Sequence, residues 1–208
     1  MLTKSKESIS STLSTARTSA GRPRSQATSD EALMERIAKG DRLAMEVLYA
    51  RHHVRVFRFS LRLIGDEHLA EDLATEVFLD VWRHADRFEG RSAVSTWVLG
   101  IARFKALSAR RRRAAEQLDE EVAKSIEDPA DDPARVLEKN DTSMIIRDCL
   151  KRLAPRHREI IDLAYYHEKS LEEVAAIVGV PKNTVKTRML RARTRLAGLL
   201  KDAGIGRD

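Results

Sequence analysis

Cysteine is almost absent from this chain of 208 residues, whose single cysteine is Cys149. One cysteine excludes an intramolecular disulfide framework and a thiolate-rich zinc site. Because Cys149 falls among apolar residues at helical spacing, we expect a small core residue there, not a redox thiol. No apolar run approaches the ~18 residues that a membrane span needs. The sequence therefore predicts a cytoplasmic protein with no membrane insertion.

Proline is also scarce, and none of the five prolines lies between Pro23 and Pro129. That stretch carries apolar residues at three- and four-residue spacing and no useful strand-like alternation, which predicts helices. Gly65 and Gly90 mark breaks, as does Gly40, and Asp41 and Asp66 can cap the helices that follow. We predict a bundle of about four helices over residues 28–113.

Four apolar stripes are expected to form the core of this bundle. They are Leu33 and Ile37; Val47, Leu48, Val54, Phe57 and Leu61; Leu69, Leu73, Val77 and Val81 with Phe78 and Trp82; and Val94, Trp97, Val98, Ile101 and Ala102.

Charge divides the rest of the chain. Residues 116–141 hold ten acids, three bases and two Asp-Pro pairs, so we expect a flexible acidic linker over 114–141. This acidic stretch is either simply solvated or a mimic of nucleic acid inside a basic partner.

Residues 1–27 form a basic, Ser/Thr-rich segment that we expect to be a disordered tail, although organellar transit peptides share this bias. The formal net charge of +6 makes anionic partners plausible.

A second helical unit is predicted over 142–202, followed by a short tail at 203–208. Within it, residues 171–190 have the spacing of a helix-turn-helix. Ser170 and Glu173 can form a capping box, and Gly179 suits the sharp turn. Pro181 fits the first turn of the second helix, where its missing N–H costs nothing. The alternative is an ordinary helical hairpin.

The second helix of this motif carries seven bases and no acid between Lys182 and Lys201. The N-terminal residues of a recognition helix enter the major groove, where Arg and Lys read guanine and Asn reads adenine. Arg193 and Arg195 lie further along the helix, where phosphate or solvent is the expected neighbour. The predicted DNA-reading residues are Lys182, Asn183, Thr184, Lys186, Thr187, Arg188 and Arg191.

The first domain has a second basic cluster after the aromatic-bearing segment 94–104. Bases beside exposed aromatics are what a site for single-stranded nucleic acid requires. Trp97 and Phe104 could instead belong to the core, and the run of arginines at 110–113 could be a solvated helix end.

These segments together resemble the extracytoplasmic-function (ECF) sigma factors of the major sigma family. The matching stretches are LKRLAPRHREII at 150–161, EVAAIVGVP at 173–181 and TVKTRMLRARTRL at 184–196, with AEDLATEVFLDVW at 70–82 and STWVLGIAR at 95–103. The resemblance covers about 28–112 and 142–202. It implies an all-α fold of two small helical domains, sigma region 2 (28–113) and sigma region 4 (142–202).

The resemblance also implies roles. The protein would bind core RNA polymerase through Asp72, Thr75, Glu76 and Asp80, and the second domain would read the -35 element as duplex. The first domain would capture the unpaired -10 strand with Arg91, Ser92, Trp97, Arg103, Phe104, Lys105, Arg110 and Arg111. The implied partners are core polymerase, promoter DNA and an anti-sigma factor, and the implied state is a monomer or heterodimer. The chain departs from the family at Thr75, where Gln is common, and at Phe104 and Ser108, where Asn and often Asp stand.

Two other functions were weighed against this one. A conventional helix-turn-helix regulator would need no surface for polymerase and would normally dimerise to match paired half-sites. An enzyme is disfavoured because the six histidines show no zincin spacing, and there is no phosphate-binding glycine loop or nucleophile elbow. We therefore expect no catalytic residues, metal or cofactor.

Overall fold

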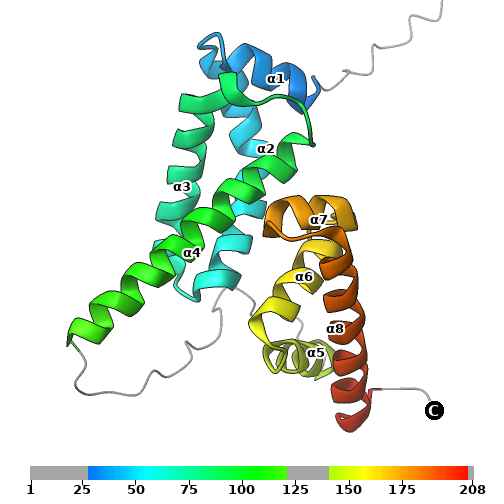
Figure 1. Ribbon diagram of the computed structural model, residues 1–208. Coiled ribbons are helices and arrows are strands. Elements are labelled where there is room, and N and C mark those ends of the chain that lie inside the picture. The colour runs from blue at the N-terminus through cyan, green and yellow to red at the C-terminus, as the bar shows by residue number, and fades with distance from the viewer. Residues whose placement is uncertain (1–27, 121–140, 206–208) are drawn as a thin grey trace, which may run out of the picture.

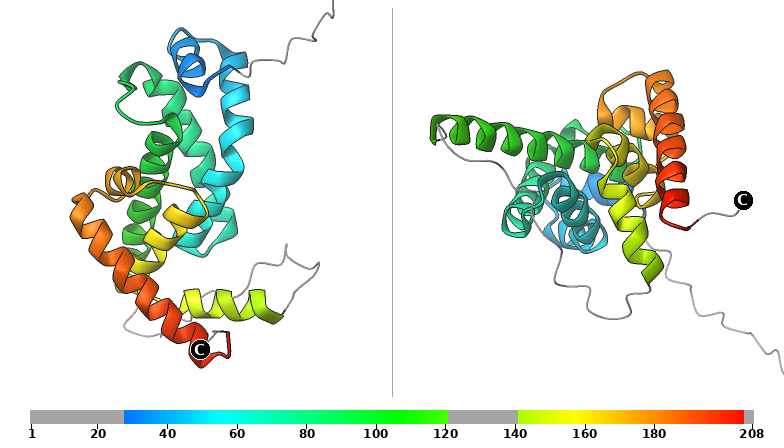
Figure 2. Two further views of the ribbon diagram at one scale, coloured as in Figure 1. Left: turned by 90° about the vertical axis from the view of Figure 1, so that its right-hand side faces the viewer. Right: turned by 90° about the horizontal axis from the view of Figure 1, so that it is seen from below.

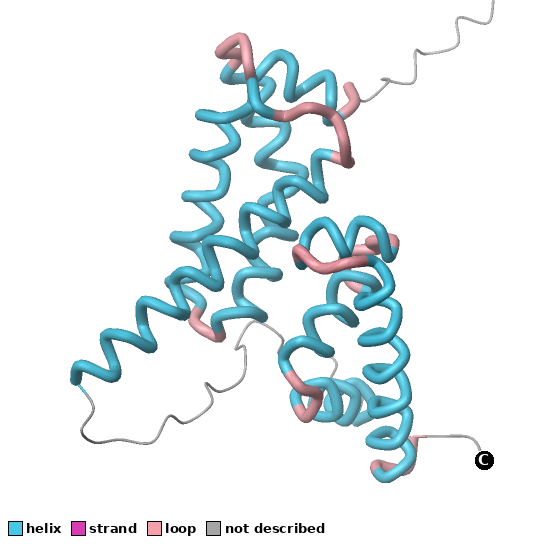
Figure 3. Tube along the Cα trace, in the orientation of Figure 1, coloured by secondary structure: helices cyan, strands magenta, loops and turns pink. Residues whose placement is uncertain are grey.

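The computed structural model describes residues 28–120 and 141–205. Every regular element within these ranges is a helix (Figure 3). The prediction of an all-α fold is therefore confirmed. The tail at 1–27 and most of the predicted linker lie outside the described residues.

The first domain consists of α1 (Asp30–Ile37), α2 (Arg42–Ile64), α3 (Glu67–His84), the short 3-10 helix η1 (Ala85–Arg87) and α4 (Val94–Glu120) (Figure 1). Asp41 and Asp66 cap α2 and α3 as predicted, each accepting a backbone N–H of the first turn, at 3.1 and 3.0 Å. Gly65 ends α2 in the left-handed conformation with φ of 78°, which glycine adopts without steric cost.

The core of the first domain contains most of the predicted stripes, but only part of the one predicted for α2. Leu48 is buried as predicted, whereas Val47 and Val54 are 42% and 52% exposed, and α2 also buries Ala44, His52, Val56 and Phe59. The polar member of that face explains the error. His52 interrupts the apolar pattern, and it is accommodated because its Nε2 lies 2.6 Å from the Asp30 carboxylate.

Helix α4 is longer than the sequence predicted. It runs to Glu120, seven residues past the expected boundary at 113, and its C-terminal end projects beyond the bundle (Figure 2). Residues 114–120 contain neither proline nor glycine and are rich in Ala, Glu, Gln and Leu. Because these residue types favour helix, the acidic composition of the segment did not end it.

The second domain consists of α5 (Asp141–Lys151), α6 (Pro155–Tyr165), α7 (Leu171–Val178) and α8 (Lys182–Asp202). Cys149 is 2% exposed, as expected of a core residue, and Leu153, Ile160 and Leu163 are buried with it. Helix α8 turns Val185, Met189, Ala192 and Leu199 inward, at intervals of four, three and seven residues that keep them on one face of the helix.

The two domains pack against each other. Helix α7 lies beside α4 (Figure 1), and buried residues of both domains join one continuous apolar cluster. A continuous core across two units buries apolar surface that each would otherwise expose to water. The arrangement therefore brings the first domain's longest helix into contact with the helix-turn-helix.

Candidate nucleic-acid interface

The helix-turn-helix is formed by α7, a tight turn and α8. Ser170 Oγ accepts the N–H of Glu173 at 3.2 Å, while the Glu173 carboxylate accepts the N–H of Ser170 at 2.9 Å. This is the predicted capping box. Gly179 follows α7 with φ of 71°, so the left-handed turn is as expected. Pro181 is the residue just before α8 and not its first helical residue.

The outward face of α8 carries the residues predicted to read DNA. Lys182, Asn183, Lys186, Thr187 and Arg191 are exposed. Thr184 and Arg188 are half-buried. Lys182 already has an anionic neighbour, because its Nζ contacts the carboxylate of Glu172 on α7. None of these side chains belongs to the buried stripe of the helix, so the surface is available to an external partner.

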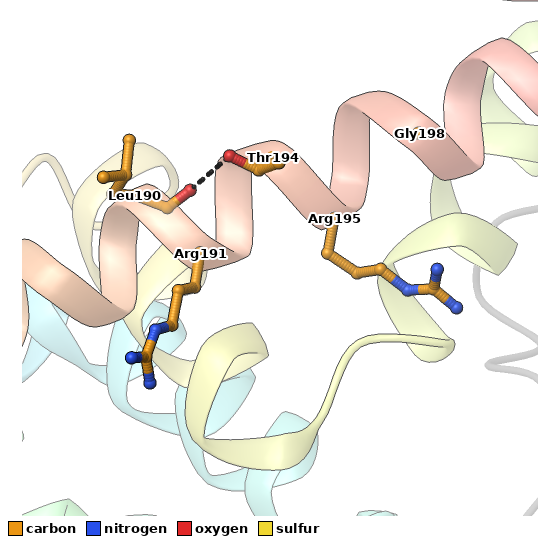
Figure 4. Close-up of a pocket in the computed structure, with 5 residues that line it drawn as sticks. All are labelled: Leu190, Arg191, Thr194, Arg195 and Gly198. Atoms are coloured by element: carbon orange, nitrogen blue, oxygen red, sulfur yellow. Dashed lines mark hydrogen bonds between the residues drawn. The ribbon is translucent and has the colours of Figure 1, made fainter.

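The middle of α8 presents a shallow pocket lined by Leu190, Arg191, Thr194, Arg195 and Gly198 (Figure 4). The side chains of Arg191 and Arg195 point to one side of the helix and that of Leu190 points away from them. Leu190 is 67% exposed, and Thr194 Oγ1 donates to its carbonyl at 3.1 Å. A large apolar side chain thus stands in water beside the basic surface.

Two basic-surface residues escaped the sequence analysis. Arg156 and His157, in the first turn of α6, line a polar pocket together with the N-terminal half of α8. Burial lowers the pKa of His157, and the charges of Arg156, Arg191 and Arg188 lower it further. This pocket is not visible in the sequence, because α6 and α8 are separated along the chain by the whole of α7.

The residues predicted to hold the -10 strand are spread along α4 and the loop before it. Arg91, Phe104, Arg110 and Arg111 are exposed, and the Phe104 side chain stands 69% in water. Ser92 is half-buried. Trp97 is partly buried, packs on the core and lies with its ring centroid 5.5 Å from that of Phe88. The two aromatic residues of the predicted site thus differ in exposure, since Phe104 is exposed to solvent and Trp97 packs against the core.

Arg103 and Lys105, two bases of the predicted -10 site, each form ion pairs with acids of the protein itself. Arg103 Nε lies 2.6 Å from Oε1 of Glu159 on α6, in the second domain. Lys105 Nζ lies 2.9 Å from Asp80 and 3.2 Å from Glu76 on α3. Burial opposes the charged form of Lys105, but hydrogen bonds to Asp80 and Glu76 raise its pKa above the usual value. The predicted strand site and the predicted polymerase face therefore meet at Lys105.

The predicted polymerase face itself lies on α3. Asp72, Thr75 and Glu76 are exposed and Asp80 is half-buried. Of these, only the two acids nearest α4 are engaged by Lys105. The face is thus a row of side chains on one helix, largely open to solvent.

Two polar clusters join the domains. In the first, Glu173 Oε1 accepts hydrogen bonds from Thr96 at 2.6 Å and from Lys169 at 2.9 Å, and Lys169 Nζ also donates to Ser95 at 2.6 Å. Burial disfavours the charged form of Glu173, but hydrogen bonds from Thr96, the Ser170 backbone and Lys169 lower its pKa to about 2. Glu173 therefore serves both the capping box of α7 and the contact with α4.

The second cluster joins α2 to the end of α6. Arg62 lies 2.6 Å from Asp162, a carboxylate that is almost wholly buried, and its guanidinium stacks over the Tyr166 ring at 4.7 Å. The Phe59 ring meets that of His167 edge-on, with centroids 5.3 Å apart. The contact between domains is therefore both charged and apolar.

Within the described residues, no group of histidine, cysteine or carboxylate side chains could hold a metal ion. Among the helices of that part of the chain, none combines the length and apolar character needed to span a membrane.

Comparison with protein families defines the class of protein first. The model of Sigma-70 region 2 matches residues 48–116, and the model of Sigma-70, region 4 matches residues 143–196. The two matches fall on the two helical domains, in the order that the sequence predicted. The second contains α7, the turn and the greater part of α8.

Individual relatives narrow the class. The chain is 30% identical over 173 residues to the ECF RNA polymerase sigma factor SigK of Mycobacterium tuberculosis, covering 82% of this chain and 92% of SigK. It is 29% identical to SigW of Bacillus subtilis, covering 81% and 95% of the two chains. The chain belongs to the extracytoplasmic-function RNA polymerase sigma factors.

Solved structures agree with this assignment. The sigma factor RpoE from Bartonella quintana, in complex with the anti-sigma factor NepR, matches with a TM-score of 0.64 and 29% identity over 75% of this chain and 96% of its own. CnrH, in complex with the cytosolic domain of CnrY, matches with a TM-score of 0.61 and 26% identity over 83% and 97%. The conventional regulator considered above is not favoured.

Proposed function

We propose that this sigma factor binds core RNA polymerase through α3, captures the unpaired -10 strand along α4 and reads the -35 element with α8. The single observation that carries the proposal is the separation of two basic surfaces onto two domains of one chain. One surface has an exposed aromatic residue beside bases, and the other is the outward face of a capped helix-turn-helix. A single-stranded site and a duplex site require these different chemistries.

The domain limits follow the same division. We propose region 2 at 28–113, a linker at 114–141 of which the first seven residues continue α4, and region 4 at 142–202. Tethering two DNA sites on one chain raises the local concentration of the second once the first is bound. Binding of the -10 element would therefore favour binding of the -35 element, and binding of the -35 element would favour that of the -10 element.

Core polymerase and promoter DNA are the partners in this scheme, with an anti-sigma factor as a further partner. The polymerase supplies the chemistry of RNA synthesis, so the protein acts as a non-enzymatic factor in the cytoplasm, one copy for each polymerase. Support for an anti-sigma partner comes from the two solved relatives, whose titles describe complexes with NepR and with the CnrY cytosolic domain.

The test is transcription in vitro. The purified full chain is added to sigma-free core polymerase with genomic DNA of the source organism, and the 5′ ends of the RNA are sequenced. New starts that share two upstream elements at fixed spacing are expected. Absence of such starts, with folded protein and with core that responds to a control sigma factor, would overturn the proposal.

A further inference from the structure

A basic pocket lies where the start of α6 meets the N-terminal half of α8. Its lining residues come from both helices and are Arg156, His157, Asn183, Thr184, Thr187, Arg188 and Arg191. Three of the seven are arginines, three can donate or accept hydrogen bonds without charge, and none is an acid. The chemistry of the lining is therefore that of a site for an oxyanion.

The arginines of this pocket have no carboxylate partner in the described residues. Other bases of the chain differ, since Lys182 contacts Glu172 and Arg103 contacts Glu159. No ion pair is formed by Arg156, Arg188 or Arg191 within 28–120 and 141–205. Like charges gathered without a counter-ion repel one another, and a bound anion relieves that repulsion.

The position of the pocket indicates which anion it takes. Asn183, Thr184 and Thr187, which the sequence analysis assigned to the duplex, form its α8 wall. A recognition helix in the major groove is flanked by the phosphates of the two strands. The pocket lies beside the N-terminal half of α8 and is shared with the start of α6. A phosphate that flanks the groove is therefore the anion expected there.

We propose that Arg156 and His157 bind a backbone phosphate of duplex DNA in this pocket, beside the base-reading surface of α8 to which Arg188 and Arg191 belong. The inference rests on the proposed role of α8 at the -35 duplex and adds two residues from α6 to it. Such a contact fixes the orientation of the recognition helix but carries no sequence information of its own. It makes α6 part of the DNA-binding surface.

His157 makes the contact sensitive to pH. The charged groups that face it are Arg156 on its own helix and Arg188 and Arg191 on α8. Burial, together with these charges, lowers the pKa of the imidazole in the free protein. A phosphate in the pocket offsets the three positive charges and favours the imidazolium, so binding takes up a proton. Affinity for duplex DNA then rises as the pH falls, by at most about tenfold for each pH unit.

The experiment measures binding of the full chain to a short fluorescein-labelled duplex by anisotropy, over a range of salt concentrations and from about pH 8 to about pH 6. Arg156→Ala is expected to reduce the slope of log K against log salt by about 0.9, as loss of one phosphate contact requires. The loss should be similar for duplexes of different sequence. His157→Gln is expected to remove the part of the pH dependence that the proton uptake creates.

Lys201→Ala is the control, because it removes one exposed positive charge from the last turn of α8, away from the pocket. An equal loss of slope in Lys201→Ala and Arg156→Ala would mean a general charge effect and overturn the inference. So would an unchanged slope in Arg156→Ala, or a pH dependence in His157→Gln equal to that of the unchanged protein. Circular dichroism of each variant confirms that it is folded.

Free phosphate offers the same chemistry as the DNA backbone, and calorimetry separates the two sources. Inorganic phosphate titrated into the full chain should show no saturable binding that depends on Arg156. Saturable binding that Arg156→Ala abolishes would assign the pocket to a free anion instead. If the unchanged protein supports transcription but Arg156→Ala leaves the salt slope of duplex binding unchanged, this inference is refuted and the proposed function stands. Failure of the unchanged protein to bind any duplex would refute the proposed function with it.

Discussion

Replacing Glu173 by glutamine tests the contact between the two domains, because this carboxylate accepts hydrogen bonds from three groups. They are Thr96 of α4 at 2.6 Å, Lys169 at 2.9 Å and the backbone of Ser170 at 2.9 Å. Glutamine keeps the shape of the side chain but removes its charge. Because both carboxylate oxygens accept hydrogen bonds and an amide offers only one acceptor, the substitution removes the charge and one acceptor together.

The size of the effect follows from the pKa of Glu173, which the fold lowers from 4.5 to about 2. At roughly 1.4 kcal/mol for each pH unit this corresponds to about 3 kcal/mol of stability. The side chain is 27% exposed, so solvent screening reduces that figure, and we expect a loss of about 1–3 kcal/mol at neutral pH. Because the folded pKa is below the unfolded one, the stabilisation is present above about pH 4.5 and disappears as the pH falls towards about 2.

The assay is urea unfolding followed by circular dichroism at neutral pH and near pH 3. Glu173→Gln should lower the free energy of unfolding at neutral pH, and its difference from the unchanged protein should shrink in acid. Glu172→Gln is the control, since the preceding residue is exposed at the start of the same helix and pairs with the exposed Lys182. Little or no change is expected there. Equal effects of the two substitutions, or a Glu173→Gln effect independent of pH, would refute the reasoning.

Three further predictions concern the interfaces. Arg188→Ala should weaken binding to the -35 duplex by ~1–3 kcal/mol and relax preference among -35 variants if the side chain contacts a base; unchanged preference in promoter-binding assays would remove it from that role. Glu76→Lys should lower affinity for core polymerase in a competition assay, whereas Glu67→Lys at the start of the same helix should not; equal competition by both would count against the α3 face. A double-mutant cycle of Arg103→Ala and Glu159→Ala should give a coupling of about 0.5–3 kcal/mol in unfolding experiments, and additive effects would show that their 2.6 Å contact contributes little.

Local signals in the sequence predicted much of the fold. The capping box at Ser170 and Glu173, the turn at Gly179 and the caps at Asp41 and Asp66 each depend on residues within a few positions of one another. Such short-range geometry is determined by residue type, so it is visible without a structure. The family resemblance then supplied the order of the two domains.

What the sequence did not predict depends on residues far apart in the chain. The buried face of α2 was partly misassigned because His52 needs Asp30, which is 22 residues away, to be tolerated in the core. The pairs Arg103–Glu159 and Thr96–Glu173 join residues 56 and 77 positions apart. The pocket at Arg156 and His157 likewise exists only because α6 and α8 fold side by side. The spacing of apolar residues along the chain does not predict contacts between residues so far apart.

The pairing of Arg103 with Glu159 has a consequence for any DNA strand that uses Arg103. Arg103 points its Nε–H and one terminal N–H at Glu159, so a strand phosphate that takes these donors must displace the carboxylate. One anion then replaces another, and the arginine passes between two charged partners without standing uncompensated in between. Glu159 acts, in this sense, as a resident substitute for phosphate. Once displaced, its nearly buried carboxylate would need water or another cation as a partner.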